Sequence, residues 1–195
     1  MDSFLNKVGS HSQVESKIDS LMTHVQASYC HSSLGTSVKI QVEGVKHYPG
    51  KTIEPSGAGL EAMYCTTRTE LGSADLMMYL VYFDPPIGTS FTAGIAYRPA
   101  VCRPSFANNH IKESINRFDP DSVASSAQTV SHEMGHNLGM FHDFAPQHKA
   151  TCDKTGLMSY FVDTNKWSTC SKADFHAHYV EFKNFWCLER KSRNN

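Results

Sequence analysis

The chain has 195 residues, a formal net charge of −1 and 19% charged residues, which suits one domain with a sizeable core. This near-neutral balance gives no basis for a nucleic-acid partner or an anionic membrane surface. The apolar run at residues 76–83 spans eight residues, too few to cross a bilayer, so no membrane segment is expected.

The first elements predicted along the chain are a helix and a strand. Residues 13–29 carry apolar side chains three or four positions apart, which predicts one helical stripe. Ser12 with Glu15 three residues later is typical of a capped helix start. Residues 38–42 alternate between apolar and charged or polar side chains, so we expect a strand with one buried face.

The next two segments predict the fold class. Residues 57–72 show a weaker helical pattern. Residues 76–83 are apolar on both faces, as in a central strand of a parallel sheet covered by helices. Helix, strand, helix and strand in this order predict an α/β fold with right-handed crossovers, built on a mixed, mostly parallel twisted sheet packed with helices.

A loop-rich stretch separates these elements from the second half of the chain. Residues 84–104 contain four prolines and two glycines, which is typical of loops. Residues 91–97 could nevertheless form an edge strand, and an ordinary surface loop is the alternative.

Two helices are predicted in the second half. From residue 121 four apolar side chains keep helical spacing and lie on a face of the predicted helix that points away from its two histidines. These four residues are Val123, Ala127, Val130 and Met134. A further helix is expected to begin with a cap at residues 171–174, and its apolar face would be formed by Phe175, Tyr179, Phe182 and Trp186.

The segment from residue 132 to 143 carries the chemistry. His132 and His136 are four apart and therefore lie on the same helix face. Glu133 lies beside the first histidine, where its carboxylate can reach a water on a metal without binding the metal. Gly139 accepts the left-handed conformation that ends a helix, so the chain can turn back and offer His142 as a third ligand. Three nitrogen ligands leave a fourth position open for water, which is typical of a catalytic zinc.

These residues resemble a known family. H-E-x-x-H-x-x-G-x-x-H is the metzincin signature, and the Asp143 that follows resembles the adamalysin/reprolysin branch of snake-venom metalloproteinases and ADAM proteases. That branch also has a methionine turn, matched here by Met158. The resemblance implies the catalytic domain of a metzincin, with a small C-terminal subdomain below the zinc cleft.

The resemblance implies a zinc-dependent endopeptidase that hydrolyses internal peptide bonds of extracellular proteins. One Zn²⁺ would be bound by the three histidines, and Glu133 would act as general base on the zinc-activated water. Met158 is expected to form a hydrophobic floor under the imidazoles. Asp143 is interpreted as a hydrogen-bond acceptor near His142, with a solvated carboxylate as the alternative. No local loop motif supports a calcium site.

The same resemblance locates a substrate groove. An edge strand above the zinc would pair with the extended substrate, at Gly94, Ile95 and Ala96. The pocket for the residue after the cleaved bond would be lined by Tyr160, Phe161 and Val162. The remaining histidines are most simply surface residues; they are His11, His24, His31, His47, His110, His148, His176 and His178.

Six cysteines indicate disulfides in an extracellular protein. The residues alone allow fifteen connectivities, or six reduced thiols in a cytosolic protein. The resemblance implies the pairs Cys30–Cys65, Cys102–Cys187 and Cys152–Cys170, the last closing a loop around Met158.

The predicted protein is one catalytic domain over residues 1–195, with an N-terminal subdomain at 1–142 and a C-terminal subdomain at 143–195. We expect a secreted or extracellular monomer acting on protein or peptide substrates, with the signal and prodomain outside this chain. The apolar strand with which this family usually begins has no counterpart before the first predicted helix. A catalytically silent zinc-binding module is the alternative function, which an intact Glu133 disfavours, and an adhesion protein is disfavoured because no Arg-Gly-Asp occurs.

Overall fold

A computed structural model describes residues 3–48, 53–67, 74–85, 87–101, 112–148, 152–160 and 164–182. Its elements, in chain order, are α1 (Ser3–Val8), α2 (His11–Tyr29), η1 (Ser32–Leu34), α3 (Gly57–Thr67), β1 (Met77–Val81), β2 (Gly94–Ala96), β3 (Glu113–Arg117), α4 (Val123–Asn137), η3 (Pro146–His148) and α5 (Thr169–Phe182). Among these residues no helix is long and apolar enough to span a membrane.

The predicted first long helix is confirmed as α2, with an earlier start. Its N-cap is Ser10, whose hydroxyl accepts a hydrogen bond from the Gln13 amide over 3.3 Å, so the predicted cap at Ser12 was wrong. The helical stripe predicted from the apolar spacing is buried at Leu21 and Val25. A short helix, α1, precedes α2 at the position where the expected family strand has no counterpart.

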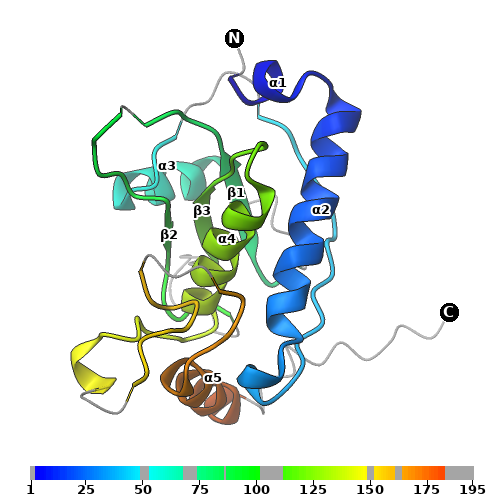
Figure 1. Cartoon of the computed structure of the whole chain (residues 1–195). Helices are drawn as coiled ribbons and strands as arrows, with labels where there is room; N and C mark the ends of the chain where they lie inside the picture. Colours follow the sequence, from blue (N-terminus) through cyan, green and yellow to red (C-terminus); the bar gives the residue numbers. More distant parts are fainter. Residues whose placement is uncertain are drawn as a thin grey trace, which may run out of the picture.

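The predicted strand at residues 38–42 does not form. This segment runs beside α2 instead of joining the sheet (Figure 1), and the Gln26 carboxamide takes the hydrogen bonds that a neighbouring strand would make. Its Nε2 donates to the Val38 carbonyl and its Oε1 accepts from the Ile40 amide, both over 2.8 Å. Val38 and Ile40 still pack on the core, whereas Val42 is 50% exposed. The alternation therefore predicted the packing of Val38 and Ile40 on the core correctly, but it was wrong about Val42 and about the pairing with a strand.

The described sheet has three strands in the order β1-β3-β2. β1 pairs in parallel with β3, from Met77 opposite Glu113 to Val81 opposite Arg117. β2 pairs antiparallel with β3, with Ile95 opposite Ile115. The α/β class is thus confirmed with a small mixed sheet, in which one pairing is parallel and one antiparallel.

The central strand is β3 and not the predicted apolar run. β1 forms within that run but lies at an edge of the described sheet. β3 has the sequence Glu-Ser-Ile-Asn-Arg, and its first four residues are buried. A buried strand with this many polar side chains carries no hydrophobic pattern, so the sequence did not predict it. The expected edge strand at residues 91–97 does form, as β2, and the loop alternative is excluded.

Helices cover the sheet on two faces. Alternate β1 residues divide between two apolar clusters: Met78 and Leu80 pack with α2 and α4, whereas Tyr79 packs with Leu60 and Met63 of α3. Because α2 and α3 lie on opposite faces, Cys30 at the end of α2 and Cys65 in α3 do not meet. Both thiols are free and exposed, so the predicted Cys30–Cys65 disulfide was wrong.

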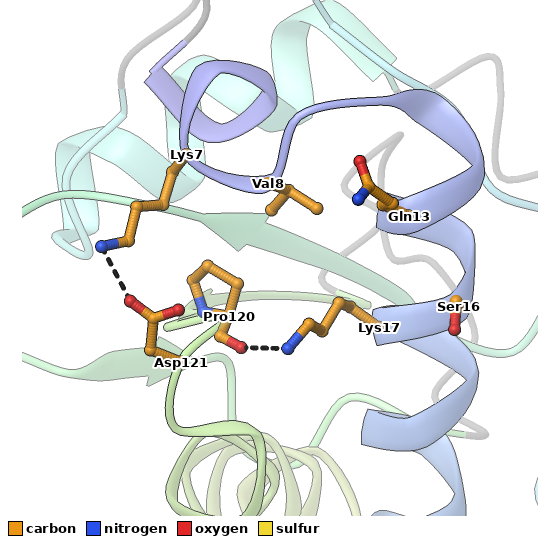
Figure 2. Close-up of a pocket in the computed structure, with 7 residues that line it drawn as sticks. All are labelled: Lys7, Val8, Gln13, Ser16, Lys17, Pro120 and Asp121. Atoms are coloured by element: carbon orange, nitrogen blue, oxygen red, sulfur yellow. Dashed lines mark hydrogen bonds and ion pairs between the residues drawn. The ribbon is translucent and has the colours of Figure 1, made fainter.

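The start of α4 is tied to the N-terminal helices. Figure 2 shows two lysines that reach the turn before α4 across a surface pocket. Lys7 of α1 forms an ion pair with Asp121 over 2.7 Å, and Lys17 of α2 donates to the Pro120 carbonyl over 2.7 Å. These contacts join α1 and α2 to the turn before α4.

The C-terminal part is joined by the predicted Cys152–Cys170 disulfide, which is present with Cα atoms 5.5 Å apart. α5 begins one turn earlier than its predicted cap, because the Ser168 hydroxyl accepts from the Ser171 amide over 2.9 Å. The predicted pair Cys102–Cys187 lies outside the described residues.

Candidate metal centre and active site

Three histidine nitrogens converge at the C-terminal end of α4. His132 and His136 lie one helical turn apart, with ring centroids separated by 4.8 Å. Gly139 ends the helix with a φ of +93°, a left-handed conformation that favours glycine, and the returning chain presents His142. The Nε2 atom of His142 lies 3.1 Å from the Nε2 atoms of both His132 and His136. The motif therefore folds as its spacing predicted.

Hydrogen bonds on the far side of two rings fix which nitrogen faces the centre. His132 Nδ1 donates to the Leu157 carbonyl over 2.7 Å, and His136 Nδ1 donates to the Met140 carbonyl over 2.9 Å. Because a carbonyl only accepts, Nδ1 carries the proton and the Nε2 lone pair points inward in both neutral rings. Nitrogens about 2.0–2.1 Å from a tetrahedral zinc would be about 3.3 Å apart, close to the separations found. The donor set therefore fits a zinc ion.

Burial keeps these imidazoles neutral. It lowers the pKa of His132 to about 4 and that of His136 to about 3, and it also lowers the pKa of His142. Neutral imidazole is the form that binds a metal, so the ligands need not lose protons near neutral pH.

Glu133 faces the edge strand from the next position on α4. Its carboxyl is 6% exposed, and burial raises its pKa to about 8. A Cβ added at Gly94 of β2 would lie 2.6 Å from Glu133 Oε1 and Cγ. The absence of a side chain at Gly94 is therefore what allows β2 and Glu133 to approach this closely.

Met158 lies under α4. It is fully buried, and a Cβ added at Gly135 of α4 would lie 2.7 Å from its Sδ atom. The Met158 carbonyl accepts from the Asp143 amide over 3.1 Å, which joins the methionine turn to the chain leaving the third histidine.

Asp143 is a buried acceptor. It is 0% exposed, and its carboxylate accepts from the Ser159 hydroxyl over 2.8 Å, from the Ser171 hydroxyl over 2.9 Å and from the Ser168 hydroxyl. The solvated alternative is thus excluded. The three serines come from the methionine turn and from the start of α5, so Asp143 connects both segments to the third histidine.

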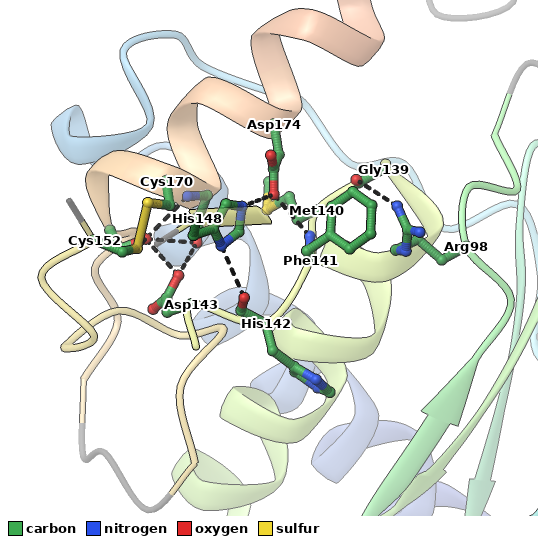
Figure 3. Close-up of polar contacts among 12 residues, drawn as sticks. Arg98, Gly139, Met140, Phe141, His142, Asp143, His148, Cys152, Cys170 and Asp174 are labelled. Atoms are coloured by element: carbon green, nitrogen blue, oxygen red, sulfur yellow. Dashed lines mark hydrogen bonds and ion pairs between the residues drawn. A yellow bond between two sulfur atoms is a disulfide. The ribbon is translucent and has the colours of Figure 1, made fainter. Parts of the chain in front are cut away.

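Sequence reasoning missed the pair formed by His148, which is buried, and Asp174, whose side chain is 17% exposed. His148 is 8% exposed and donates from Nδ1 to the His142 carbonyl and from Nε2 to Asp174, each over 2.9 Å. Asp174 also accepts from the Phe141 amide over 2.9 Å (Figure 3). His148 and His178 were both predicted at the surface, and both are buried. The one feature of the sequence that bears on this pair is the i, i+4 spacing of Cys170 and Asp174, which places both on one face of α5 but does not mark His148.

A second group of possible metal ligands includes two cysteine sulfurs that are bonded to each other. His148, Cys152 and Cys170 have ligand atoms within 4.8 Å of one another, but the two sulfurs are joined in the disulfide. The histidine triad is therefore the group with free donor atoms.

Aromatic rings form one wall beside the triad. Tyr160 is 55% exposed, and its hydroxyl lies 3.5 Å from His142 Nδ1. Phe144, which the sequence reasoning did not single out, stacks on the His142 ring at 4.9 Å and lies 4.7 Å from the Tyr160 ring. The other two predicted pocket residues, Phe161 and Val162, lie outside the described residues.

The fold and the site together define a metalloprotease-type domain, and comparison with known proteins gives the family. The Reprolysin (M12B) family zinc metalloprotease model matches residues 68–191, so the chain belongs to the reprolysin family, as the motif predicted.

Three relatives match parts of the chain. Snake venom metalloproteinase trimerelysin-2 of Protobothrops flavoviridis is 30% identical over 93 residues, covering 47% of this chain and 43% of that protein. Human disintegrin and metalloproteinase domain-containing protein 9 is 35% identical over 88 residues, covering 45% and 10%. A disintegrin and metalloproteinase with thrombospondin motifs 1 of Bombyx mori is 33% identical over 79 residues, covering 38% and 8%. In each case the match spans less than half of the relative's length.

Proposed function

We propose that this protein is a zinc-dependent endopeptidase that hydrolyses internal peptide bonds of extracellular proteins, with Glu133 as general base. The observation that carries the proposal is the convergence of three histidine Nε2 atoms, with that of His142 3.1 Å from each of the other two, next to a buried glutamate. Family membership supports the same reaction class.

The metal would be held by His132, His136 and His142. Bound there, zinc supplies positive charge that polarises the scissile carbonyl and makes water a stronger acid. Asp143 and the carbonyls of Leu157 and Met140 keep the ligands in place, as described above. Calcium plays no part in this proposal.

Glu133 would move the proton. Burial holds its pKa near 8 in the absence of a cation, and a nearby divalent charge favours the carboxylate and lowers that pKa. The carboxylate then takes a proton from the attacking water and passes it to the leaving amine.

Substrate would bind along β2. As an edge strand of the described sheet, β2 offers Gly94, Ile95 and Ala96 for pairing with an extended peptide, and Gly94 adjoins Glu133. Tyr160, with Phe161 and Val162, would line the pocket for the residue after the cleaved bond.

The remaining expectations belong to the same proposal. The Cys152–Cys170 disulfide supports a secreted or extracellular location. The Cys102–Cys187 pair, the division into residues 1–142 and 143–195, and a monomeric state stay predictions.

The test is metal content and cleavage measured on the same samples. We expect one zinc per chain, with cleavage of denatured casein lost on chelation and restored by zinc. The matched control is Glu133→Gln, which should keep the zinc and lose about 10²–10⁴-fold in kcat. Zinc without cleavage in the unaltered protein would favour the silent binding module, and full activity in Glu133→Gln would remove its role as base.

A further inference from the structure

Arg98 presents a fixed positive charge at the rim of the proposed cleft. It follows β2 by two residues and its side chain is exposed. The guanidinium carbon lies 3.1 Å from the centroid of the Phe141 ring, and Nη1 donates to the Gly139 carbonyl over 3.5 Å (Figure 3). Stacking on an aromatic face already restricts an arginine side chain, so the side chain loses less conformational entropy when it binds an anion.

Arg98 lies beside the metal site, because the Phe141 ring and the Gly139 carbonyl that it contacts belong to residues between the ligands His136 and His142. A bound zinc would add positive charge, so the rim attracts anionic groups.

We infer that Arg98 is a specificity-determining residue that selects substrates with an aspartate or glutamate before the scissile bond. The inference rests on the proposed function. A peptide paired with β2 places its scissile bond near Glu133 at the Gly94 end, whereas Arg98 lies at the other end. β2 ends at Ala96, so its extended part covers about 7 Å, or two residues of a paired peptide counted from Gly94, and Arg98 follows beyond it.

Strand direction decides on which side of the cleavage the acid lies. Antiparallel pairing is slightly more stable than parallel pairing. An antiparallel peptide runs from the Arg98 end toward the Gly94 end, so the residues facing Arg98 precede the bond that faces Glu133. The acidic residue is therefore placed about two to four positions before the cleaved bond.

The experiment uses peptides that differ only at those positions, carrying Asp, Asn or Lys. For the unaltered zinc-loaded protein we expect kcat/KM to be about five- to tenfold higher with Asp than with Lys, a preference that shrinks in high salt. Arg98→Glu should reverse the order, and Arg98→Gln should abolish it. Lys39→Glu, a charge reversal at an exposed residue beside α2, is the matched control and should keep the original order.

A binding measurement separates this inference from the proposed function. The dissociation constants of the same peptides are measured by fluorescence anisotropy on Glu133→Gln, with and without Arg98→Glu. An Asp preference that Arg98→Glu inverts supports the inference even if no sample cleaves, in which case only the proposed hydrolysis fails. An identical Asp, Asn and Lys order in the unaltered protein and in Arg98→Glu would overturn it.

Discussion

The imidazole of His148 donates to the carboxylate of Asp174 while its other ring nitrogen donates to the backbone carbonyl of His142. The side chains of this pair are 7% and 17% exposed, so the contact is largely shielded from solvent. Asp174 holds the neighbouring Phe141 amide as well. The backbone on both sides of the Phe141–His142 peptide bond is thereby attached to α5.

This attachment predicts a loss of metal affinity when it is removed. His148→Ala frees the carbonyl of the third ligand segment and leaves Asp174, whose side chain is 17% exposed, without this partner, so we expect about a 10–100-fold weaker zinc affinity. Competition with a chromophoric chelator measures it. His24→Ala, at an exposed histidine of α2, is the control. Equal zinc affinities in the two variants would show that the attachment does not position His142.

The contact between Gly94 and Glu133 predicts a different kind of loss. Gly94→Ala places a Cβ 2.6 Å from the carboxyl oxygen, so either β2 or the glutamate must shift. A displacement of about 1 Å at a catalytic group costs about 10²-fold in rate, and we expect that fall in kcat with zinc still bound. Gly44→Ala is the matched control because a Cβ there meets no atom within 4 Å. Unchanged turnover in Gly94→Ala would show that the approach has no catalytic consequence.

Asp143 predicts a loss of stability. Asp143→Ala leaves the buried hydroxyls of Ser168 and Ser171 and the half-buried hydroxyl of Ser159 without their shared acceptor. Hydrogen bonds to a charged group contribute about 1.5–3 kcal/mol each, although other partners can partly replace them. We expect the free energy of unfolding to fall by about 3 kcal/mol in urea denaturation, a typical cost of breaking a buried network. The surface variant Asp153→Ala should change it by less than about 0.5 kcal/mol. A result below 1 kcal/mol for Asp143→Ala would contradict the assigned network.

Glu113 predicts a pH dependence of stability. Burial raises its pKa from 4.5 to about 7 in the folded protein, so between these values the folded chain keeps a proton that the unfolded chain releases. Its stabilising contribution is complete below pH about 4.5, decreases as the pH rises and is lost above about 7. The shift corresponds to about 3 kcal/mol.

The measurement compares Glu113→Gln with the unaltered protein at pH 5 and pH 8. Other groups titrate over this range in both proteins, so the difference between the two isolates Glu113. We expect the unaltered protein to lose more stability on going to pH 8, and Glu61→Gln, at an exposed residue of α3, to behave like the unaltered protein. Equal losses in Glu113→Gln and the unaltered protein would refute the burial effect.

The parts of the site that the sequence predicted are those set by short-range geometry. The i, i+4 spacing of His132 and His136 and the turn at Gly139 depend on a single helix and its end, and they form as expected. The apolar face of α4 could likewise be predicted from the sequence, because the helical spacing of apolar residues indicates which face is buried.

The predictions that were wrong depend on which segments meet in space. Residues 38–42 do not form the predicted strand, because the Gln26 side chain makes hydrogen bonds with their backbone. β3 was not predicted, because most of its buried residues are polar. Cys30 and Cys65 were paired by resemblance, although the sheet separates their helices. His148 has no local pattern that marks it, since its partners come from α5 and from the chain after Gly139.

The close approach of Gly94 to Glu133 also has a consequence for where a peptide is cut. In the proposed function, main-chain atoms of β2 would bind the substrate, and Gly94 of the same strand adjoins Glu133. Any peptide aligned on β2 is therefore aligned on Glu133 without reference to its side chains. Main-chain pairing with β2 would determine which peptide bond is cleaved. Side-chain contacts such as those at Arg98 would determine only which sequences stay bound long enough to be cleaved.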